Sequence, residues 1–278
     1  MTISLPILLY HRIDQARSSL STSPAEFRRH LQWLSERGWR TLSLEQFAFY
    51  ARSGKELPAH SFLLTFDDGY ACLSASAADI LREFNFSAVC FLCTRLLRGP
   101  QQDNNLAGVD NSCFLDWNQA RALQQSGVVE FQSHTHSHEK FGEATQREVM
   151  EDLGTSREWL AHELRLPKTM FNHLAWPWGE SRESWRLAAM RCGLQYQYTV
   201  SRQAYSRSSP MQQMPRTCYD GATLANFQTQ FWLQVGPLAG LWNSAYPVLR
   251  RLRRPAIEVP APENATTVAG VDASNGAS

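Results

Sequence analysis

The stretch SFLLTFDDGY, residues 61–70, joins the pattern of a buried strand to two adjacent carboxylates. Four of its first six residues are apolar, which is typical of a parallel strand covered on both faces. Asp67 and Asp68 follow directly. A single acid here could cap the helix that follows, but two successive side chains point in different directions. Capping therefore accounts for at most one of them, and the pair indicates a functional site at a strand end.

Short apolar runs alternate with helical patterns on both sides of this stretch. The predicted strands are ILLY (7–10), WRTL (39–42), FLLTF (62–66), SAVCFLC (87–93), VVEF (128–131), HLAW (173–176) and YQYTV (196–200). Capping signatures at Ser23, Ser43 and Thr145 predict the starts of three helices between them. The alternation predicts a parallel α/β sheet, either a closed barrel or an open doubly wound sheet. In both, active sites form at the C-terminal ends of the strands.

The alternation stops after the last of these strands. Residues 223–253 predict one or two amphipathic helices that end in VLRRLRR. Packing on the domain is favoured over a membrane-surface anchor, although aromatic side chains beside arginines suit such an anchor. The remainder is rich in proline, alanine, glycine and small polar residues, which predicts disorder. We therefore expect a domain over 1–221, a helical extension over 222–254 and a disordered tail over 255–278.

The composition excludes some roles. A net charge of +1 offers no general attraction for nucleic acid. The start MTISLPILLYHRI lacks the features of an export signal, and no apolar stretch is long enough to span a bilayer. The expectation is a cytoplasmic protein, with peripheral contact to the inner membrane face left open. Cys90 and Cys93 form a CxxC within an apparent strand, where structural thiols are favoured over a metal or redox site.

Two further polar clusters follow predicted strands. SHTHSH, residues 133–138, holds three of the eight histidines directly after VVEF. Imidazole and carboxylate are ligands that zinc and similar divalent metals prefer, and two histidines with one aspartate leave positions open for catalysis. A solvated histidine-rich loop is the less favoured alternative. YHRI, residues 10–13, places His11 at the end of the first strand, which favours a functional role over a packed core histidine.

The motifs together resemble a known family. TFDDGY (65–70), HTHSH (134–138) and AWPWG (175–179) resemble the polysaccharide deacetylase, or NodB-homology, family of carbohydrate esterase family four, over roughly residues 5–220. YHRI resembles the poly-N-acetylglucosamine deacetylase branch, in which the catalytic histidine motif is permuted to the N-terminus. The family fold is a distorted (β/α)7 barrel. This resemblance, and not the periodicity, favours the closed barrel.

The resemblance also implies roles for the first two motifs. It makes Asp67 the general base and Asp68 a ligand of one divalent metal ion. His134 and His138 match the two histidine ligands, whereas His136 falls on a variable position and is not assigned. Zinc is the first candidate for the metal, with cobalt, nickel, manganese and iron as alternatives.

The remaining roles are less direct. The permuted pattern makes His11 the general acid, and the backbone N–H of Tyr70 is expected to help hold an oxyanion. Many members carry an arginine that orients the base at the position occupied here by Ala175. Arg216, in QMPRT, is a candidate substitute, with an ordinary surface arginine as the equally weighted alternative.

Aromatic residues near the second and third motifs are candidates for sugar binding. Trp117, Trp176, Pro177 and Trp178 could line a groove, because indole faces stack on pyranose rings. Core packing is an equally plausible role for each tryptophan.

The expected function is a metal-dependent hydrolase that removes the N-acetyl group from an amino sugar. The substrate would be a poly- or oligosaccharide or a lipid-linked glycan intermediate in surface-polysaccharide biosynthesis or modification. The absence of an export signal favours the lipid-linked intermediate, with the basic C-terminal helix at the inner leaflet. The alternatives are a deformylase of a lipid-linked amino sugar and a non-catalytic carbohydrate-binding relative. The second is disfavoured because the base and all three ligands are present.

Overall fold

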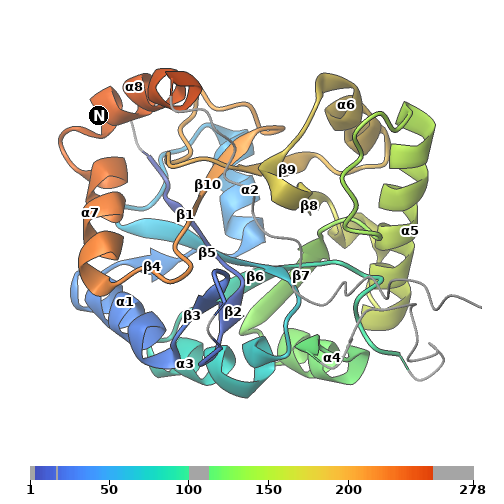
Figure 1. Cartoon of the computed structure of the whole chain (residues 1–278), viewed down its shortest axis with the longest axis horizontal. Coiled ribbons are helices and arrows are strands. Elements are labelled where there is room, and N and C mark those ends of the chain that lie inside the picture. Colours follow the sequence, from blue (N-terminus) through green and yellow to red (C-terminus); the bar gives the residue numbers. More distant parts are fainter. Residues whose placement is uncertain (1–3, 17, 100–112, 253–278) are drawn as a thin grey trace, which may run out of the picture.

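Seven parallel strands close into a barrel in the computed structural model, which describes residues 4–16, 18–99 and 113–252. Their order is β1-β10-β9-β8-β7-β6-β5, and the ring closes because β1 pairs with both β10 and β5 (Figure 1). The strands are β1 (Ile7–Tyr10), β5 (Ser61–Asp68), β6 (Ala88–Leu92), β7 (Val129–Ser133), β8 (His173–Ala175), β9 (Tyr196–Val200) and β10 (Met214–Cys218). The closed ring confirms the barrel and excludes the open sheet.

Helices and short helical segments surround this ring. They are α1 (Pro24–Glu36), α2 (Leu44–Ser53), η1 (Leu73–Ala77), α3 (Ala78–Glu83), α4 (Trp117–Gln125), α5 (Gln146–Leu164), η3 (Lys168–Met170), η4 (Pro177–Gly179), α6 (Glu183–Arg191), α7 (Leu224–Val235) and α8 (Ala239–Leu252). Ser43 and Thr145 form complete capping boxes, which confirms the predicted starts of α2 and α5. Ser23 caps α1 by accepting the Glu26 N–H, while the Glu26 side chain bonds Arg29 instead.

The seventh barrel strand differs from the prediction. WRTL (39–42) contributes only the two-residue strand β4 (Arg40–Thr41), which pairs with the start of β5 outside the ring. The ring is completed by β10, which carries Pro215 and Arg216. A proline and a charged residue are both unfavourable in a central strand, so the sequence pattern did not predict β10. A small parallel pair, β2 (Arg12–Ile13) with β3 (Ser21–Thr22), follows β1.

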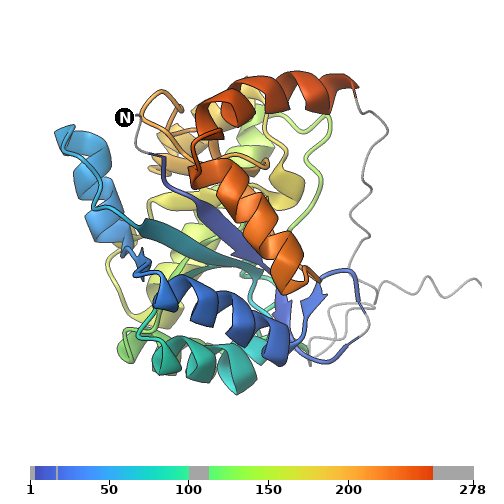
Figure 2. The ribbon, with the colours of Figure 1, turned by 90° about the vertical axis from the view of Figure 1, so that its left-hand side faces the viewer.

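The C-terminal helices differ in how they meet the barrel. Figure 2 shows α7 beside the barrel and α8 along its upper edge in that view. Phe227 and Phe231 of α7 are buried in the same hydrophobic core as barrel and α1 residues. The expected helical extension is thus present as two helices, and the first shares the core of the barrel. The boundary at residue 221 stays a prediction, and the predicted disordered tail over 255–278 lies outside the described residues. Within the described part of the chain, no helix combines the length and apolar character needed to cross a membrane.

A buried histidine joins α1 to α7 and predicts how stability responds to acid. His30 has no exposed surface, its ring stacks on Phe227 at 4.3 Å, and its Nδ1 lies 3.0 Å from the Tyr10 hydroxyl. Burial lowers the pKa of His30 to about 4. In the unfolded chain His30 therefore binds a proton below about pH 6.5, whereas in the folded chain it binds one only below about pH 4. The free energy of unfolding should fall by up to about 3 kcal/mol across this range from this group alone.

Denaturant unfolding at pH 7 and pH 4.5 measures this effect. His30→Gln keeps an acceptor for Tyr10 but removes the titration, so the loss of stability between the two pH values should become smaller. His162→Gln, at an exposed position of α5, is the matched control. An equal loss of stability in wild type and His30→Gln would contradict the prediction.

Candidate metal and catalytic site

Two adjacent buried carboxylates at the end of β5 contact different partners. Both Asp67 and Asp68 are buried, and Asp68 adopts a positive φ of 70°. Aspartate tolerates this left-handed conformation better than most residues. Gly69 continues the turn with φ of 90°, and a Cβ there would lie 2.6 Å from the side chain of Leu92. The strand therefore ends in a sharp turn that sends the two carboxylates to different partners.

Asp68 meets the two histidines that follow β7. Its Oδ1 lies 3.4 Å from His134 Nε2 and 3.1 Å from His138 Nε2. His134 Nδ1 is 2.8 Å from the carbonyl oxygen of Ala175. A carbonyl only accepts hydrogen bonds, so Nδ1 carries a proton and Nε2, which faces Asp68, is the nitrogen that can bind a cation.

The donor set of this cluster fits a divalent cation. The ligand atoms of Asp68, His134 and His138 all lie within 4.8 Å of one another. Asp68 Oδ1 is buried and has no hydrogen-bond partner among the described residues, despite the two nearby nitrogens. A buried carboxylate oxygen without a hydrogen-bond partner is unfavourable unless a cation binds it, and the His2Asp set leaves coordination positions open. The three residues therefore form a candidate site for a divalent metal ion.

Asp67 is held by an arginine from the strand that closes the barrel. Arg216 Nη1 and Nη2 donate to the two oxygens of Asp67 at 2.6 and 2.7 Å. The Arg216 side chain is fully buried, so the alternative of an ordinary surface arginine is wrong. Burial is the largest single influence and raises the pKa of Asp67, but Arg216, His134 and His11 together lower it by more, so the pKa lies below its usual value. Asp67 therefore stays ionised beside the candidate metal site, with its Oδ2 3.7 Å from His134 Nε2.

His11 has an acidic partner that the sequence did not indicate. Its Nδ1 lies 2.6 Å from Asp220 Oδ2, and its backbone N–H donates to Asp220 Oδ1 at 3.0 Å. Burial is the largest single influence and lowers the pKa of His11, but Asp220 together with Cys218 and Asp68 raises it by more, to well above the usual range. Asp220 lies just beyond the end of β10, much as Asp67 and Asp68 lie at the end of β5, but the sequence did not indicate this because β10 itself was not predicted.

The backbone at Tyr70 leaves one N–H outside the local pairing. Tyr70 faces Phe114 across an isolated bridge. The bonds on either side run from Ala71 N–H to Cys113 O at 2.8 Å and from Leu115 N–H to Gly69 O at 2.9 Å. The Tyr70 N–H takes part in neither of them. Its expected contact with an oxyanion stays a prediction.

The predicted sugar-binding groove is wrong for three of its four residues. Trp117 and Trp176 are completely buried in two hydrophobic clusters, and Pro177, which follows Trp176, is also buried. Trp176 also donates its Nε1–H to Gln197 at 3.0 Å, so its indole is committed to packing. Trp178 differs, because it is half-buried and its ring lies 5.4 Å from that of His138. Only this member of the predicted groove remains available beside the candidate site.

The unassigned histidine and the CxxC lie apart from the metal ligands. His136 Nδ1 lies 2.9 Å from the Thr94 hydroxyl, and the backbone N–H of His136 donates to Asp152 at 2.7 Å. Cys90 and Cys93 are buried, free thiols. None of these three joins a metal-type cluster within the described ranges, which supports the structural assignment of the CxxC.

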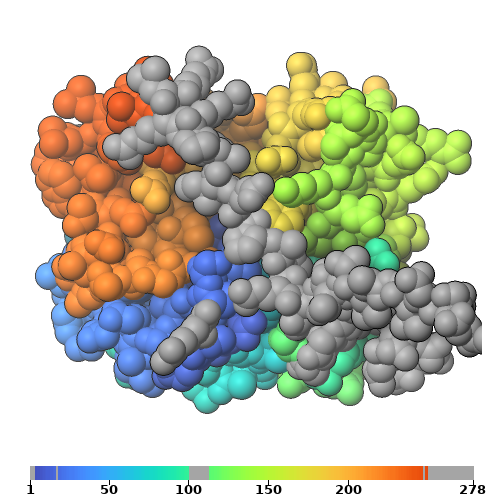
Figure 3. Space-filling model, viewed as in Figure 1, coloured from blue at the N-terminus to red at the C-terminus, as the bar shows by residue number. Residues whose placement is uncertain are grey.

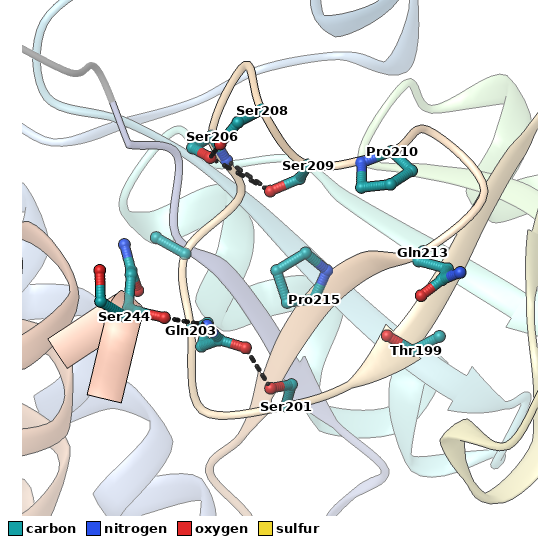
Figure 4. Close-up of a pocket in the computed structure, with 12 residues that line it drawn as sticks. Thr199, Ser201, Gln203, Ser206, Ser208, Ser209, Pro210, Gln213, Pro215 and Ser244 are labelled. Atoms are coloured by element: carbon teal, nitrogen blue, oxygen red, sulfur yellow. Dashed lines mark hydrogen bonds between the residues drawn. The ribbon is translucent and has the colours of Figure 1, made fainter. Parts of the chain in front are cut away.

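A cavity of about 400 Å³ lies away from these residues, between the β9–β10 loop and α8 (Figure 4). Hydroxyl and amide groups line much of it. Ser201 donates to Gln203 Oε1 at 2.8 Å, and Gln203 donates to the backbone oxygen of Asn243 at 2.7 Å. No lining residue carries a titratable side chain, so the cavity offers no side-chain acid or base.

Fold and site together define the class of parallel-barrel enzymes with a metal-type cluster at the C-terminal ends of the strands. A family model described as polysaccharide deacetylase matches residues 54–197, just over half of the chain. The chain therefore belongs to the polysaccharide deacetylase family.

Individual relatives are distant. YxkH of Bacillus subtilis (strain 168), whose name classes it among polysaccharide deacetylases, is 25% identical over 212 residues, covering 76% of this chain and 70% of the relative. The poly-beta-1,6-N-acetyl-D-glucosamine N-deacetylase of Staphylococcus aureus (strain MSSA476) is 22% identical over 232 residues, covering 75% and 76%. The solved structure of Streptococcus pyogenes deacetylase PplD in complex with acetate superposes with a TM-score of 0.72 at 20% identity, over 83% of this chain and 99% of that one. This superposition confirms the distorted seven-stranded barrel.

Proposed function

We propose that the chain is a metal-dependent N-deacetylase of an N-acetylated amino sugar within a polysaccharide, an oligosaccharide or a lipid-linked glycan. The observation that carries the proposal is the Asp67 carboxylate, ionised by Arg216 and adjacent to Asp68, His134 and His138. Such a site suits amide hydrolysis, which needs an activated water, a polarised carbonyl and a protonated leaving amine. The activity named for the Staphylococcus aureus relative supports an N-acetylglucosamine polymer as the substrate class.

Each residue has a proposed role in that reaction. Asp68, His134 and His138 would hold one divalent ion, with zinc the first candidate. When bound, the ion supplies Lewis acidity to the carbonyl and lowers the pKa of a bound water. Asp67 would accept the proton of the attacking water, and His11 would protonate the leaving nitrogen. The Tyr70 N–H would face the oxyanion, and the position of His11 directly after β1 supports the permuted branch.

Product analysis tests the activity. The metal-loaded protein is incubated with β-1,6-linked and β-1,4-linked N-acetylglucosamine oligomers, with lipid-linked N-acetylhexosamine and with a lipid-linked N-formylated amino sugar, and acetate and formate are quantified. Acetate release that depends on Asp67 is the expected result. Formate release from N-formylated sugar alone would instead identify a deformylase. Binding without release of either acid would identify a non-catalytic relative.

Asp220 is expected to act as a positioning residue for His11. Asp220→Asn keeps the shape but weakens the hydrogen bond to Nδ1, so kcat should fall by about 10²-fold while KM changes little. Asp220→Glu should recover part of kcat. The measurement is a steady-state series on the preferred oligomer. Asp116→Asn is the control, because asparagine caps α4 as well as aspartate does. Equal losses in Asp220→Asn and Asp116→Asn, or a rise in KM alone, would contradict this role.

The surface of α8 supports the proposed contact with an anionic membrane. Leu241 and Val248 are 71% and 56% exposed, and the sequence continues into RRLRR at 250–254. In Figure 3, α7 and α8 form the orange and red upper corner of the molecule. Apolar side chains beside arginines suit the interface of anionic lipid, where each cation near the surface contributes about 1 kcal/mol.

Cosedimentation with vesicles measures this contact. Binding to phosphatidylglycerol vesicles should exceed binding to phosphatidylcholine vesicles and should fall at least about tenfold in Leu241→Glu with Val248→Glu. Leu187→Glu, at a 46% exposed position of α6, is the control. Equal binding to both vesicle types would contradict the contact. The cytoplasmic location stays a prediction, which fractionation of producing cells tests.

A further inference from the structure

A second cluster of metal-ligating side chains lies at the end of β10. The ligand atoms of His11, Cys218 and Asp220 lie within 4.8 Å of one another. The Cys218 thiol donates to Asp220 Oδ2 at 3.1 Å, and His11 Nδ1 donates to the same oxygen at 2.6 Å. Two donors thus converge on one carboxylate oxygen, which is the arrangement that a cation replaces when it displaces their protons.

The ligand types select the kind of cation. Thiolate, imidazole and carboxylate together suit zinc, and the thiolate also favours softer ions such as cadmium. Magnesium and calcium prefer oxygen ligands and would not compete well here. The cluster shares no residue with Asp68, His134 and His138, so both groups of ligands can be occupied in one molecule.

We propose that His11, Cys218 and Asp220 form a second site for a thiophilic divalent cation, and that its occupancy inhibits the enzyme. On binding, the thiol proton passes to solvent and the cation takes its place on Sγ. The His11 imidazolium releases its Nδ1 proton to solvent, keeps the proton on Nε2 and binds the cation through Nδ1. Ligands of a tetrahedral zinc at about 2.0–2.3 Å lie roughly 3.3 Å apart, so the Asp220 carboxylate needs only a small rotation from its present contacts.

Inhibition follows from the loss of the His11–Asp220 hydrogen bond, and this part rests on the proposed function. With Nδ1 bound to the cation, Asp220 no longer accepts a hydrogen bond from the ring. The ring also cannot carry protons on both nitrogens. A general acid at this place is therefore disabled. Metal should accordingly activate the enzyme at one equivalent and inhibit it at higher concentration.

Cadmium titration of the full chain tests the site without any assay of activity. Equilibrium dialysis should show two bound Cd²⁺ per wild-type chain and one per Cys218→Ser chain. The ultraviolet charge-transfer absorbance of a cadmium–thiolate bond should appear in wild type and be lost in Cys218→Ser. Asp68→Asn should lose the other ion and keep this absorbance.

The remaining cysteines provide the control. Cys192 is also half-buried and free, so Cys192→Ser should retain both the second Cd²⁺ and the absorbance. One bound ion in wild type, or an absorbance that survives Cys218→Ser, would overturn the proposal. Where deacetylation is observed, excess zinc should reduce the rate at least tenfold in wild type and less in Cys218→Ser, each relative to its own rate at one equivalent. Equal inhibition of wild type and Cys218→Ser would show that the second site is not inhibitory. Absence of deacetylation would contradict the proposed function but would not change the result of the cadmium-binding experiment.

Discussion

Asp68→Asn is expected to abolish turnover and metal binding at the Asp68–His134–His138 site together, whereas Asp67→Asn abolishes turnover and leaves the metal of that site bound. Asp68 Oδ1 faces both histidine nitrogens, so the amide removes a charged ligand from the centre of the cluster. Asp67 instead pairs with Arg216 and lies at the edge of that cluster. Loss of a general base lowers kcat by about 10²–10⁴-fold. The measurements are metal content after dialysis and the rate of acetate release.

His136→Asn is the matched control for this pair of variants. His136 belongs to the same histidine-rich segment but bonds Thr94 and lies outside the metal-type cluster. Its replacement should therefore leave one metal ion bound. Full metal content in Asp68→Asn, or metal loss in Asp67→Asn equal to that in Asp68→Asn, would show that the two carboxylates do not divide their roles in this way.

Arg216→Met is expected to destabilise the fold and the site at once. The methionine fills part of the space beside Phe91, whose ring centre lies 5.2 Å from the guanidinium carbon, but leaves the buried Asp67 charge without its arginine partner. Removal of one partner from a buried ion pair lowers the free energy of unfolding by about 3–5 kcal/mol. Arg216→Lys keeps the charge but cannot donate to both oxygens, so we expect an intermediate loss.

A double-mutant cycle isolates the pair. Asp67→Asn with Arg216→Met removes both charges and should recover a large part of the stability lost in Arg216→Met, as measured by denaturant unfolding. The exposed pair Arg28–Glu83, with side chains 47% and 46% exposed, is the control, and its disruption should cost less than about 1 kcal/mol. A cost for Arg216→Met as small as this would show that the Asp67 charge is not stabilised mainly by Arg216.

Local sequence patterns predicted much of the fold and part of the site. Six of the seven barrel strands were visible as apolar runs, because a strand covered on both faces needs apolar side chains along its whole length. Asp67, Asp68 and the histidines after β7 stood out because polar residues interrupt those runs at strand ends. In the same way, capping boxes at Ser43 and Thr145 located helix starts, since each box is formed by residues three apart.

Other features depend on contacts that no local pattern records. From residue type alone, Trp117, Trp176 and Trp178 are equally good candidates for a sugar-binding groove. The packing of helices on the barrel buries the first two and leaves the third beside His138. Asp220 was missed because its meaning depends on His11, which lies 209 positions away. Burial and hydrogen-bond partners are properties of the packed molecule, and neither follows from residue type alone.

The amino-acid sequence by itself determined the alternating α/β pattern, the strand-end carboxylates and histidines, and membership of a recognisable family. Only the tertiary structure decided which strand closes the barrel and which basic side chain binds the proposed base, Asp67. Both answers lie in β10, where Arg216 would be unfavourable in an ordinary buried strand. It is tolerated because Asp67, 149 positions away in the chain, supplies the opposite charge across the barrel interior at 2.6 Å.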